Sequence, residues 1–491
     1  TGPFRWWIHE SFLDNKPMDR FATELIRMQG SAYYGGPAGF ELATQNDVPM
    51  AAKAHIVGEA FLGIDMKCAR CHDAPSHDYL QRDLFELAAM LKRGPESVPK
   101  SSSIVRSPEE LELLSVRVTL KPGEKVAPNW PFEELIGKNV REDLLQNPVD
   151  SRERLALLVT SPENERFARV TVNRLWARLL GRGLVEPVGD WERPRPSHPE
   201  LLEFLAHEFV ANGYDFKHVA RLILNSQAYQ RAHAREEVEF ASRRLFASSI
   251  RRRLQAEQVV DSMFAVAGKP LDCEEQSVDL DTARSYKSSL SLGHPRRAWM
   301  FTSTSNERDR PSLALPASLT IVSVLENFGW RGARQSPLTQ RETDPSVLQP
   351  AILANGAAGM RITQLSEGGA LTRLALEADS VEQLVEQVYL RMLTRPPTVQ
   401  ERQAYVELLR EGFTTRVCDV PIEESLTPLR STNVVTWSNH LTPGANDLKK
   451  ELEKIVEQGD RPTPRLEADW RDRMSDMIWA LLNSPEFVMV P

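Results

Sequence analysis

Five consecutive residues, Cys68-Ala69-Arg70-Cys71-His72, constrain this chain more than any other feature of its sequence. Two thiols three positions apart can each form a thioether bond to one edge of a porphyrin, and the adjacent imidazole can then ligate the iron. With 4 Cys and 10 His in 491 residues, chance produces this pattern about 0.0007 times per chain. The motif predicts one covalent haem c, with Cys68 and Cys71 as anchors and His72 as the proximal iron ligand.

Zinc is the competing interpretation of the same residues, and a pair of unmodified thiols is a third. A structural zinc ion needs about four protein ligands. Cys68 and Cys71 supply two, and His72 or His77 supplies another. The chain has no second C-x-x-C to complete the set, so haem is the favoured interpretation.

Composition describes an ordinary globular protein. The chain is 41% hydrophobic and 26% charged, and its length predicts two or three domains. Its net charge of −8 speaks against a nucleic-acid partner. No run approaches the roughly 18 consecutive apolar residues of a transmembrane segment.

The haem interpretation carries an expectation about location, because covalent attachment follows export across the bacterial inner membrane. We expect a periplasmic or otherwise extracytoplasmic protein, with a leader that precedes Thr1 in a longer precursor. In such a compartment Cys273 and Cys418 can pair. Two free buried thiols are the equal alternative, and the sequence leaves both open.

Apolar residues at helical spacing recur along most of the chain, which predicts a mainly α-helical fold. The expected helices cover 18–28, 50–64, 83–91, 162–180, 245–266, 314–328, 346–360, 368–377, 380–393 and 466–483. Alternating residues predict short strands over 116–120 and 298–302. Ser197 and Glu200 have the spacing of a capping box that opens a further helix ending near 212.

We expect a multi-helical, two-part architecture with a small β insertion and long loops. A helical cytochrome-type segment with the C-x-x-C-H motif covers 1–93. A loop and β linker or insertion covers 94–150, and a helical domain covers 151–491.

A polar loop between two helices of the last part contains a second group of candidate residues. Asp190, Arg193 and His198 could form a cluster there. The favoured alternative is structural: Asn173 and Arg174 tie the loop down by hydrogen bonds, while His198 lies in a helix cap.

Longer strings link these features to a known family. They are Ala60-Phe61-Leu62-Gly63, Cys68-Ala69-Arg70-Cys71-His72-Asp73, Leu87-Ala88-Ala89, Val172-Asn173-Arg174-Leu175-Trp176, Gly181-Arg182-Gly183-Leu184-Val185-Glu186-Pro187, Ser197-His198-Pro199-Glu200-Leu201-Leu202, Leu222-Ile223-Leu224-Asn225-Ser226 and Leu482-Asn483-Ser484-Pro485-Glu486-Phe487-Val488. Together they resemble the planctomycete proteins that join a cytochrome-type domain to a planctomycete-specific domain, both of unknown function. The resemblance implies an exported protein and no particular reaction.

One departure from the family concerns the residues after the motif. Relatives usually continue H-D-H after the cysteines, whereas this chain reads His72-Asp73-Ala74 and has its next imidazole at His77. A role of the second histidine in relatives is therefore absent here or has passed to His77.

The sixth iron ligand decides between two kinds of haem protein. A methionine or histidine there gives an electron carrier, whereas an open position gives haem-dependent oxidoreductase chemistry. Met90, His77 and His55 are the candidates, with a distant residue or no protein ligand as the remaining alternative. Met90 also fits a core position on an apolar helix face.

These observations predict an exported c-type haem protein that transfers electrons or acts as a haem-dependent oxidoreductase. A redox partner protein is the expected partner, and an upstream fragment of the same precursor is a second one. The alternative is a non-catalytic helical scaffold, with structural haem or zinc at the motif, that binds a protein or glycan through exposed Trp surfaces. The sequence assigns no catalytic residue and no substrate.

Overall fold

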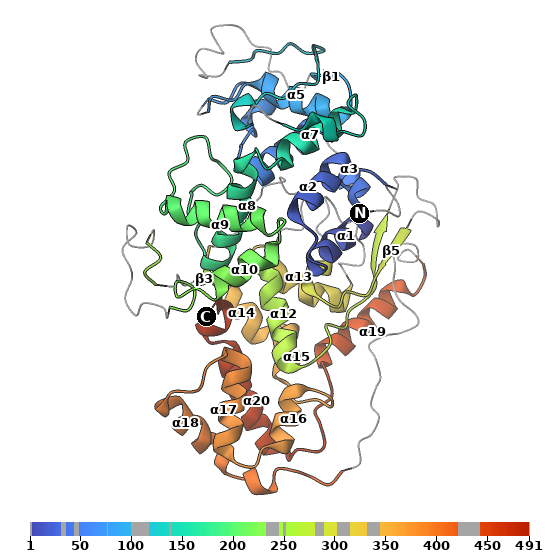
Figure 1. Cartoon of the computed structure of the whole chain (residues 1–491). Coiled ribbons are helices and arrows are strands. Elements are labelled where there is room, and N and C mark those ends of the chain that lie inside the picture. The colour runs from blue at the N-terminus through green and yellow to red at the C-terminus, as the bar shows by residue number, and fades with distance from the viewer. Residues whose placement is uncertain are drawn as a thin grey trace. The chain divides into compact units, whose positions relative to one another are not determined.

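The protein divides into two compact units, Thr1–Ile250 and Arg251–Pro491, whose helices and strands are drawn in Figure 1. Each unit has its own hydrophobic core. The computed structural model describes residues 2–30, 36–43, 49–75, 77–99, 117–136, 140–231, 245–248, 252–279, 289–301, 315–330, 344–420 and 442–490. The sequence placed domain boundaries at 93/94 and 150/151, whereas the boundary between the two compact units follows Ile250. Residues 151–250 thus share a compact unit with residues 1–93.

The first unit is built from α-helices joined by short 3₁₀ turns and loops. Its α-helices are α1 (Gly2–Leu13), α2 (Met18–Arg27), α3 (Gly39–Ala43), α4 (Pro49–Val57), α5 (Gln81–Lys92), α7 (Ser151–Thr160), α8 (Glu165–Leu180), α9 (Pro199–Ala211) and α10 (Phe216–Leu224). The remaining elements are η1 (Gly36–Ala38), the π-helical turn η2 (Gly58–Leu62), η3 (Cys68–Arg70), η5 (Glu133–Leu135), η6 (Glu142–Leu144), β1 (Glu96–Ser97) and β2 (Lys125–Val126).

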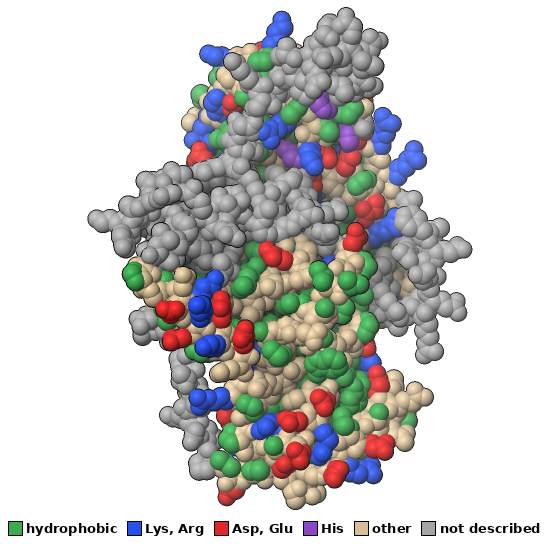
Figure 2. Space-filling view, turned by 180° about the vertical axis from the view of Figure 1, so that it is seen from behind, with side chains coloured by type: hydrophobic (Ala, Val, Ile, Leu, Met, Phe, Trp, Pro, Cys, Tyr) green, Lys and Arg blue, Asp and Glu red, His purple; other side chains and the backbone are tan. Residues whose placement is uncertain are grey.

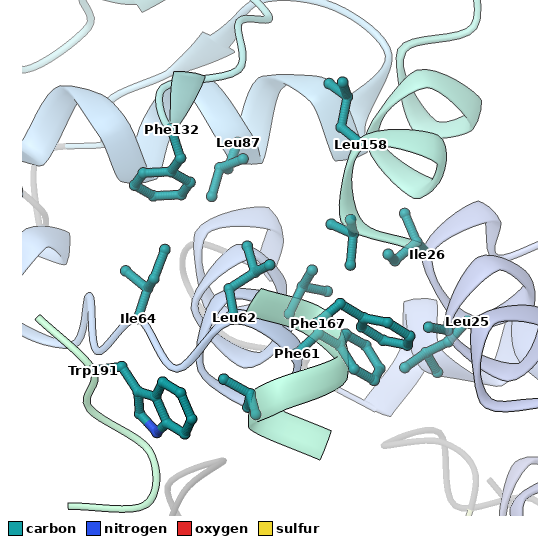
Figure 3. Packing of buried hydrophobic residues seen from close by; sticks show 14 of the residues in the cluster. Leu25, Ile26, Phe61, Leu62, Ile64, Leu87, Phe132, Leu158, Phe167 and Trp191 are labelled. Carbon is teal, nitrogen blue, oxygen red and sulfur yellow. The ribbon is translucent and has the colours of Figure 1, made fainter. Parts of the chain in front are cut away.

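The core of the first unit joins segments that lie far apart in the sequence. Phe61 of η2 packs beside Phe167 of α8, with ring centroids 5.9 Å apart (Figure 3). Trp191, from the loop between α8 and α9, is 2% exposed and lies near Ile64. Burial of each such side chain contributes roughly 1.5–3 kcal/mol, so the core holds the segment after α4 against α8 and its following loop.

The second unit is also mainly helical. Its α-helices are α12 (Ala256–Ala267), α13 (Pro316–Asn327), α14 (Leu348–Asn355), α15 (Ala357–Thr363), α16 (Ala370–Glu377), α17 (Val381–Leu393), α18 (Val399–Arg410), α19 (Ala445–Gln458) and α20 (Ala468–Leu482). Its other elements are β3 (Arg252–Arg253), β4 (Gln276–Asp279), β5 (Ser289–Gly293), β6 (Met489–Val490), η7 (Ala298–Met300), η10 (Phe413–Thr415) and η11 (Pro485–Val488). The strands form isolated antiparallel pairs, β3 with β6 and β4 with β5.

The structure confirms a mainly α-helical protein. Most predicted helices are present with ends shifted by a few residues, but two predictions were wrong in extent. The helix expected over 245–266 begins at Ala256, because Arg252–Arg253 pair with Met489–Val490 as strands. The helix expected over 346–360 is two helices, because Gly356 has an extended backbone (ψ 148°) that ends α14 and starts α15.

Both predicted strands were wrong within the described residues; Val116 and Thr302 lie outside them. Residues 117–120 form no strand, and the short antiparallel pair of this region joins β1 to β2 instead. Side chains hold residues 117–120 in place of a strand ladder: Thr119 Oγ1 donates to Asp73 and the Leu120 N–H donates to Gln81. Residues Ala298–Met300 form a 3₁₀ turn, and the backbone N–H of Ala298 donates a hydrogen bond to Asp261 Oδ1.

The predicted capping box was also wrong. The Ser197 hydroxyl lies 3.2 Å from the Leu184 carbonyl oxygen and bonds to it, so it does not cap α9. His198 is the N-cap residue, without a capping side chain.

No helix among the described residues is long and apolar enough to span a membrane.

Candidate functional site

The C-x-x-C-H motif lies at the surface of the first unit on a tight turn. Cys68–Arg70 form η3, and the backbone N–H groups of Cys71 and His72 both donate to the Cys68 carbonyl oxygen, at 3.1 and 3.3 Å. Ala69 is fully buried and anchors the turn in the core. Cys68 is exposed and Cys71 is half-buried, and neither is in a disulfide. Both thiols are therefore accessible to a ligand.

The His72 imidazole has a defined orientation. Its Nδ1 lies 2.7 Å from the backbone oxygen of Asp73. A carbonyl oxygen only accepts hydrogen bonds, so in the neutral imidazole Nδ1 carries the proton and Nε2 has the free electron pair. Histidines that bind metals are commonly oriented in this way, by donation from the other ring nitrogen to a carbonyl group.

Asp73 connects the motif to the rest of the unit. Its side chain is buried, and Oδ1 accepts bonds from the Gln81 N–H (2.9 Å) and the Thr119 hydroxyl (2.8 Å). Its own N–H donates to the Arg117 carbonyl oxygen at 2.8 Å. These bonds hold the carbonyl that orients His72 against the start of α5.

Met90 lies at the other end of α5. It is nine residues after Gln81, which is about 14 Å along the helix axis at 1.5 Å per residue. Its side chain is 1% exposed within the core of the first unit. This surrounding favours the packing role of Met90 over the role of iron ligand.

His77 is paired with a residue from the polar loop. Its Nε2 lies 2.7 Å from Asp190 Oδ2, and its ring stacks on Tyr79. Partial burial disfavours protonation, but the hydrogen bond and the charge of Asp190 outweigh it and raise the pKa of His77. The pair joins the segment after the motif to the loop between α8 and α9.

The polar loop is tied down partly as the sequence predicted. Asn173 donates to the Val185 carbonyl oxygen (3.0 Å) and accepts from the Val185 N–H (2.9 Å), which confirms its structural role. Arg174 points elsewhere: Nη2 donates to the backbone oxygen of Glu59 at 2.6 Å. The backbone N–H of Trp191 donates to the Gly63 carbonyl oxygen at 2.7 Å and attaches the loop to the segment after α4.

The other candidates of this loop are not brought together. Asp190 pairs with His77, whereas His198 Nδ1 contacts the Ser197 hydroxyl at 3.1 Å. Arg193 lines an open polar hollow with Arg182 and Arg195.

His55, Glu59 and Asp65 form a polar cluster that sequence reasoning found only in part. His55 lies on α4, and Glu59 follows four residues later on η2. Gly63 ends η2 with a left-handed backbone (φ +65°), and Asp65 lies in the loop that follows it. One donor atom from each of the three side chains lies within 4.8 Å of the other two. The His55-x-x-x-Glu59 spacing was the available signal, because residues four apart share a helix face.

Burial and neighbouring charges shift the pKa values of two members of this cluster. Burial lowers the pKa of His55, so its imidazole is neutral at pH 7. Burial, reinforced by Asp65 and Asp190 and opposed by Arg174, raises the pKa of Glu59 to about 7. Figure 2 shows that histidines visible on one face lie among acidic and basic side chains.

The remaining cysteines are free thiols in the second unit. Cys273 is buried and Cys418 is half-buried. Burial raises the pKa of Cys273 to about 12, so this thiol is protonated and unreactive at neutral pH.

Two family models match the chain. Residues 151–409, more than half of the chain, match PSD1, a protein of unknown function (DUF1553). Residues 1–96 match PSCyt2, a protein of unknown function (DUF1549). No curated protein and no solved structure matches the chain. The expectation of paired domains of unknown function is confirmed.

Proposed function

The chain belongs to the PSD1 family, and we propose that it is an exported c-type haem protein that acts as a haem-dependent oxidoreductase. One observation carries the proposal: two accessible thiols precede an imidazole whose Nδ1 is bound to a carbonyl and whose Nε2 is available for iron. The PSCyt2 name of the family matched by residues 1–96 and the resemblance to planctomycete cytochrome-type domains support it.

The residues of the motif fit the group. Cys68 and Cys71 would form the two thioether bonds, and His72 Nε2 would bind the iron. Haem c supplies one-electron redox chemistry when bound. The chain's own contribution is to hold the His72 tautomer through the Asp73 carbonyl and to keep that carbonyl in place through α5.

The surroundings of the three sixth-ligand candidates favour none of them, which leaves a distant residue or an open position, and we propose the open position. Met90 is buried in the core, His77 is paired with Asp190, and His55 faces two carboxylates. An open position suits binding of a small molecule at the metal, so we favour an oxidoreductase over a simple electron carrier.

Export and a partner follow from this chemistry. Covalent attachment takes place outside the cytoplasm, so we propose a periplasmic or otherwise extracytoplasmic location. An oxidoreductase of this kind must exchange electrons, which we assign to a redox partner protein.

The scaffold alternative receives less support. Among the described tryptophans, Trp6 and Trp479 are strongly exposed, at 43% and 45%, and they belong to different units. Neither unit therefore presents a group of exposed tryptophans within its described residues.

The test is covalent haem retention after expression in a host with cytochrome c maturation. We expect a Soret band, haem stain that survives denaturing electrophoresis, reduced stain in Cys71→Ser, and complete loss of stain when both Cys68 and Cys71 are replaced by serine. Cys418→Ser, a half-buried thiol of the second unit, is the matched control and should stain fully. A colourless, iron-free wild-type chain, or full stain in Cys71→Ser, contradicts the proposal.

Carbon monoxide then tests the sixth position. Addition to the reduced protein should shift the Soret band, because an open position binds the gas. An unshifted spectrum would instead indicate a six-coordinate electron carrier.

A further inference from the structure

We propose that His55, Glu59 and Asp65 bind one divalent transition-metal ion of the zinc class, at a site separate from the C-x-x-C-H motif. The proposal does not rest on the haem, because it uses none of the motif's residues.

The three side chains enclose a gap of suitable size. His55 Nε2 lies 4.0 Å from Glu59 Oε2, and Nδ1, on the other side of the ring, lies 3.9 Å from Asp65 Oδ1. One ion binds only one of these nitrogens, and a set of one donor atom from each side chain lies within 4.8 Å of one another. These distances are too long for hydrogen bonds. Ligands that each lie 2.0–2.2 Å from one zinc ion are about 3–3.5 Å apart, so the side chains would rotate toward a shared ion to reach coordination distance.

The buried imidazole independently points to a ligand. The His55 side chain is 8% exposed, and neither of its ring nitrogens has a hydrogen-bond partner. Buried polar groups in proteins are normally satisfied, and each exception calls for an explanation. A metal ion bound to one ring nitrogen supplies the missing partner.

The surroundings of Glu59 orient its carboxylate toward His55. Arg174 Nη2 lies 3.8 Å from Oε1, which leaves Oε2 facing His55. Gly189 makes room for this arrangement, because a Cβ at that position would lie 2.5 Å from Glu59 Oε1. Asp65 is fixed in turn by the Lys67 N–H, which donates to Oδ1 at 2.9 Å. Such supporting contacts around the ligands are typical of metal sites.

The donor set selects the kind of ion. One imidazole with two carboxylates suits zinc and neighbouring transition metals, whereas magnesium and calcium prefer oxygen ligands alone. Three protein ligands leave at least one position for water. Catalytic zinc sites have this feature and structural zinc sites do not.

Metal binding is best measured on the full chain carrying Cys68→Ser and Cys71→Ser, so that the thiols cannot contribute. After chelator treatment, calorimetric titration with Zn²⁺ should give one ion per chain. His55→Ala and Asp65→Asn should each weaken binding at least about tenfold. His207→Ala, which removes an exposed histidine of α9, should leave it unchanged.

Gly189→Ala tests the geometry without removing a ligand. The new methyl group should displace the flexible end of Glu59 and weaken Zn²⁺ binding by about tenfold. Gly94→Ala is the matched control, because a Cβ there meets nothing within 4 Å. Unchanged affinity in Gly189→Ala would contradict the assignment of Glu59 as a ligand.

Two further results overturn the proposal. One is equal Zn²⁺ affinity in His55→Ala and its parent chain. The other is binding by the wild-type chain that disappears in the Cys→Ser chain, since the ion then lies at the motif. In that case Co²⁺ on the wild-type chain would show a thiolate charge-transfer band. The haem stain of the wild-type chain is a separate measurement. A negative zinc result therefore leaves the haem proposal testable, and a negative haem result leaves the zinc proposal testable.

Discussion

Two buried polar clusters, one in each compact unit, differ in how their groups are satisfied. In the second unit, Lys269 Nζ donates to two carbonyl oxygens at 2.5 and 2.7 Å and lies 3.0 Å from Asp460, which also pairs with Arg361 at 3.1 Å. In the first unit, the buried His55 nitrogens have no hydrogen-bond partner. The charged groups of the second cluster have partners within the protein, whereas the first cluster has the unpaired donor atoms that the proposed ion would use.

Lys53 of α4 is a second unsatisfied group in the first unit. Its side chain is fully buried, and Nζ has no hydrogen-bond partner. Nζ lies 6.0 Å from the centroid of the Phe40 ring, and the charge of Glu41 offsets the effect of burial only in part. The contrast with Lys269 is therefore between a buried cation whose ammonium group has hydrogen-bond partners and one whose ammonium group has none.

The largest expected effect is loss of the satisfied cluster. Asp460→Asn should lower the free energy of unfolding of the second unit by about 3 kcal/mol at pH 7, because Lys269 keeps its charge without a counter-ion. Burial raises the pKa of Asp460, but the charges of Lys269 and Arg361 outweigh it and lower that pKa. The stabilisation is therefore present above the unfolded pKa of about 4 and is lost as the pH falls through the folded value.

Urea unfolding followed by circular dichroism measures this loss. Asp472→Asn, at an exposed position of α20, is the control and should change stability by less than about 0.5 kcal/mol. If Asp460→Asn and Asp472→Asn lowered the free energy of unfolding equally, the cluster around Asp460 would have no special stabilising role.

Removing the unsatisfied cation should have the opposite sign. Lys53→Met should raise the free energy of unfolding by about 2 kcal/mol at pH 7, because the ammonium group no longer has to be buried. Burial lowers the pKa of Lys53 to about 8, whereas the unfolded value is about 10.4. Wild-type stability therefore rises with pH between these values, and the advantage of the variant shrinks.

Unfolding curves at about pH 7 and about pH 10 test both statements. Lys125→Met, at an exposed position of β2, is the control and should be nearly neutral. A destabilised Lys53→Met would mean that the ammonium group has a stabilising partner.

The smallest expected effect concerns the pair between His77 and Asp190. Asp190→Asn should lower stability by less than about 1 kcal/mol in mild acid, because the pair is partly exposed. The raised pKa of His77 means that its contribution is fully present below the unfolded pKa of about 6.5 and is lost as the pH rises through the folded value.

Thermal unfolding at about pH 5.5 and about pH 8.5 checks the pH dependence. Asp143→Asn removes the partner of Arg141 in a fully exposed pair and is the control. An effect of Asp190→Asn that grows with pH would contradict the assigned charge state.

The strength of the periodic apolar signal differs among the helices, and α7 was missed despite its broad buried face, because that face includes the charged Arg152 and Glu153. Five residues of α2 are buried at the predicted spacing. In α18 only Val406 and Leu409 are buried, and in α19 only Ala445 and Leu452. Neither α18 nor α19 was predicted, because two buried residues give too weak a periodic signal.

The sequence by itself determined what depends on neighbouring residues: the helical periodicity, the turn that carries Cys68, Cys71 and His72, and the four-residue spacing of His55 and Glu59. Only the tertiary structure decided which distant groups meet. His77 and Asp190 are 113 residues apart, and Arg174 is 115 residues from Glu59. Local spacing sets which side chains share a helix face, but contacts over such separations depend on how the helices and loops pack together.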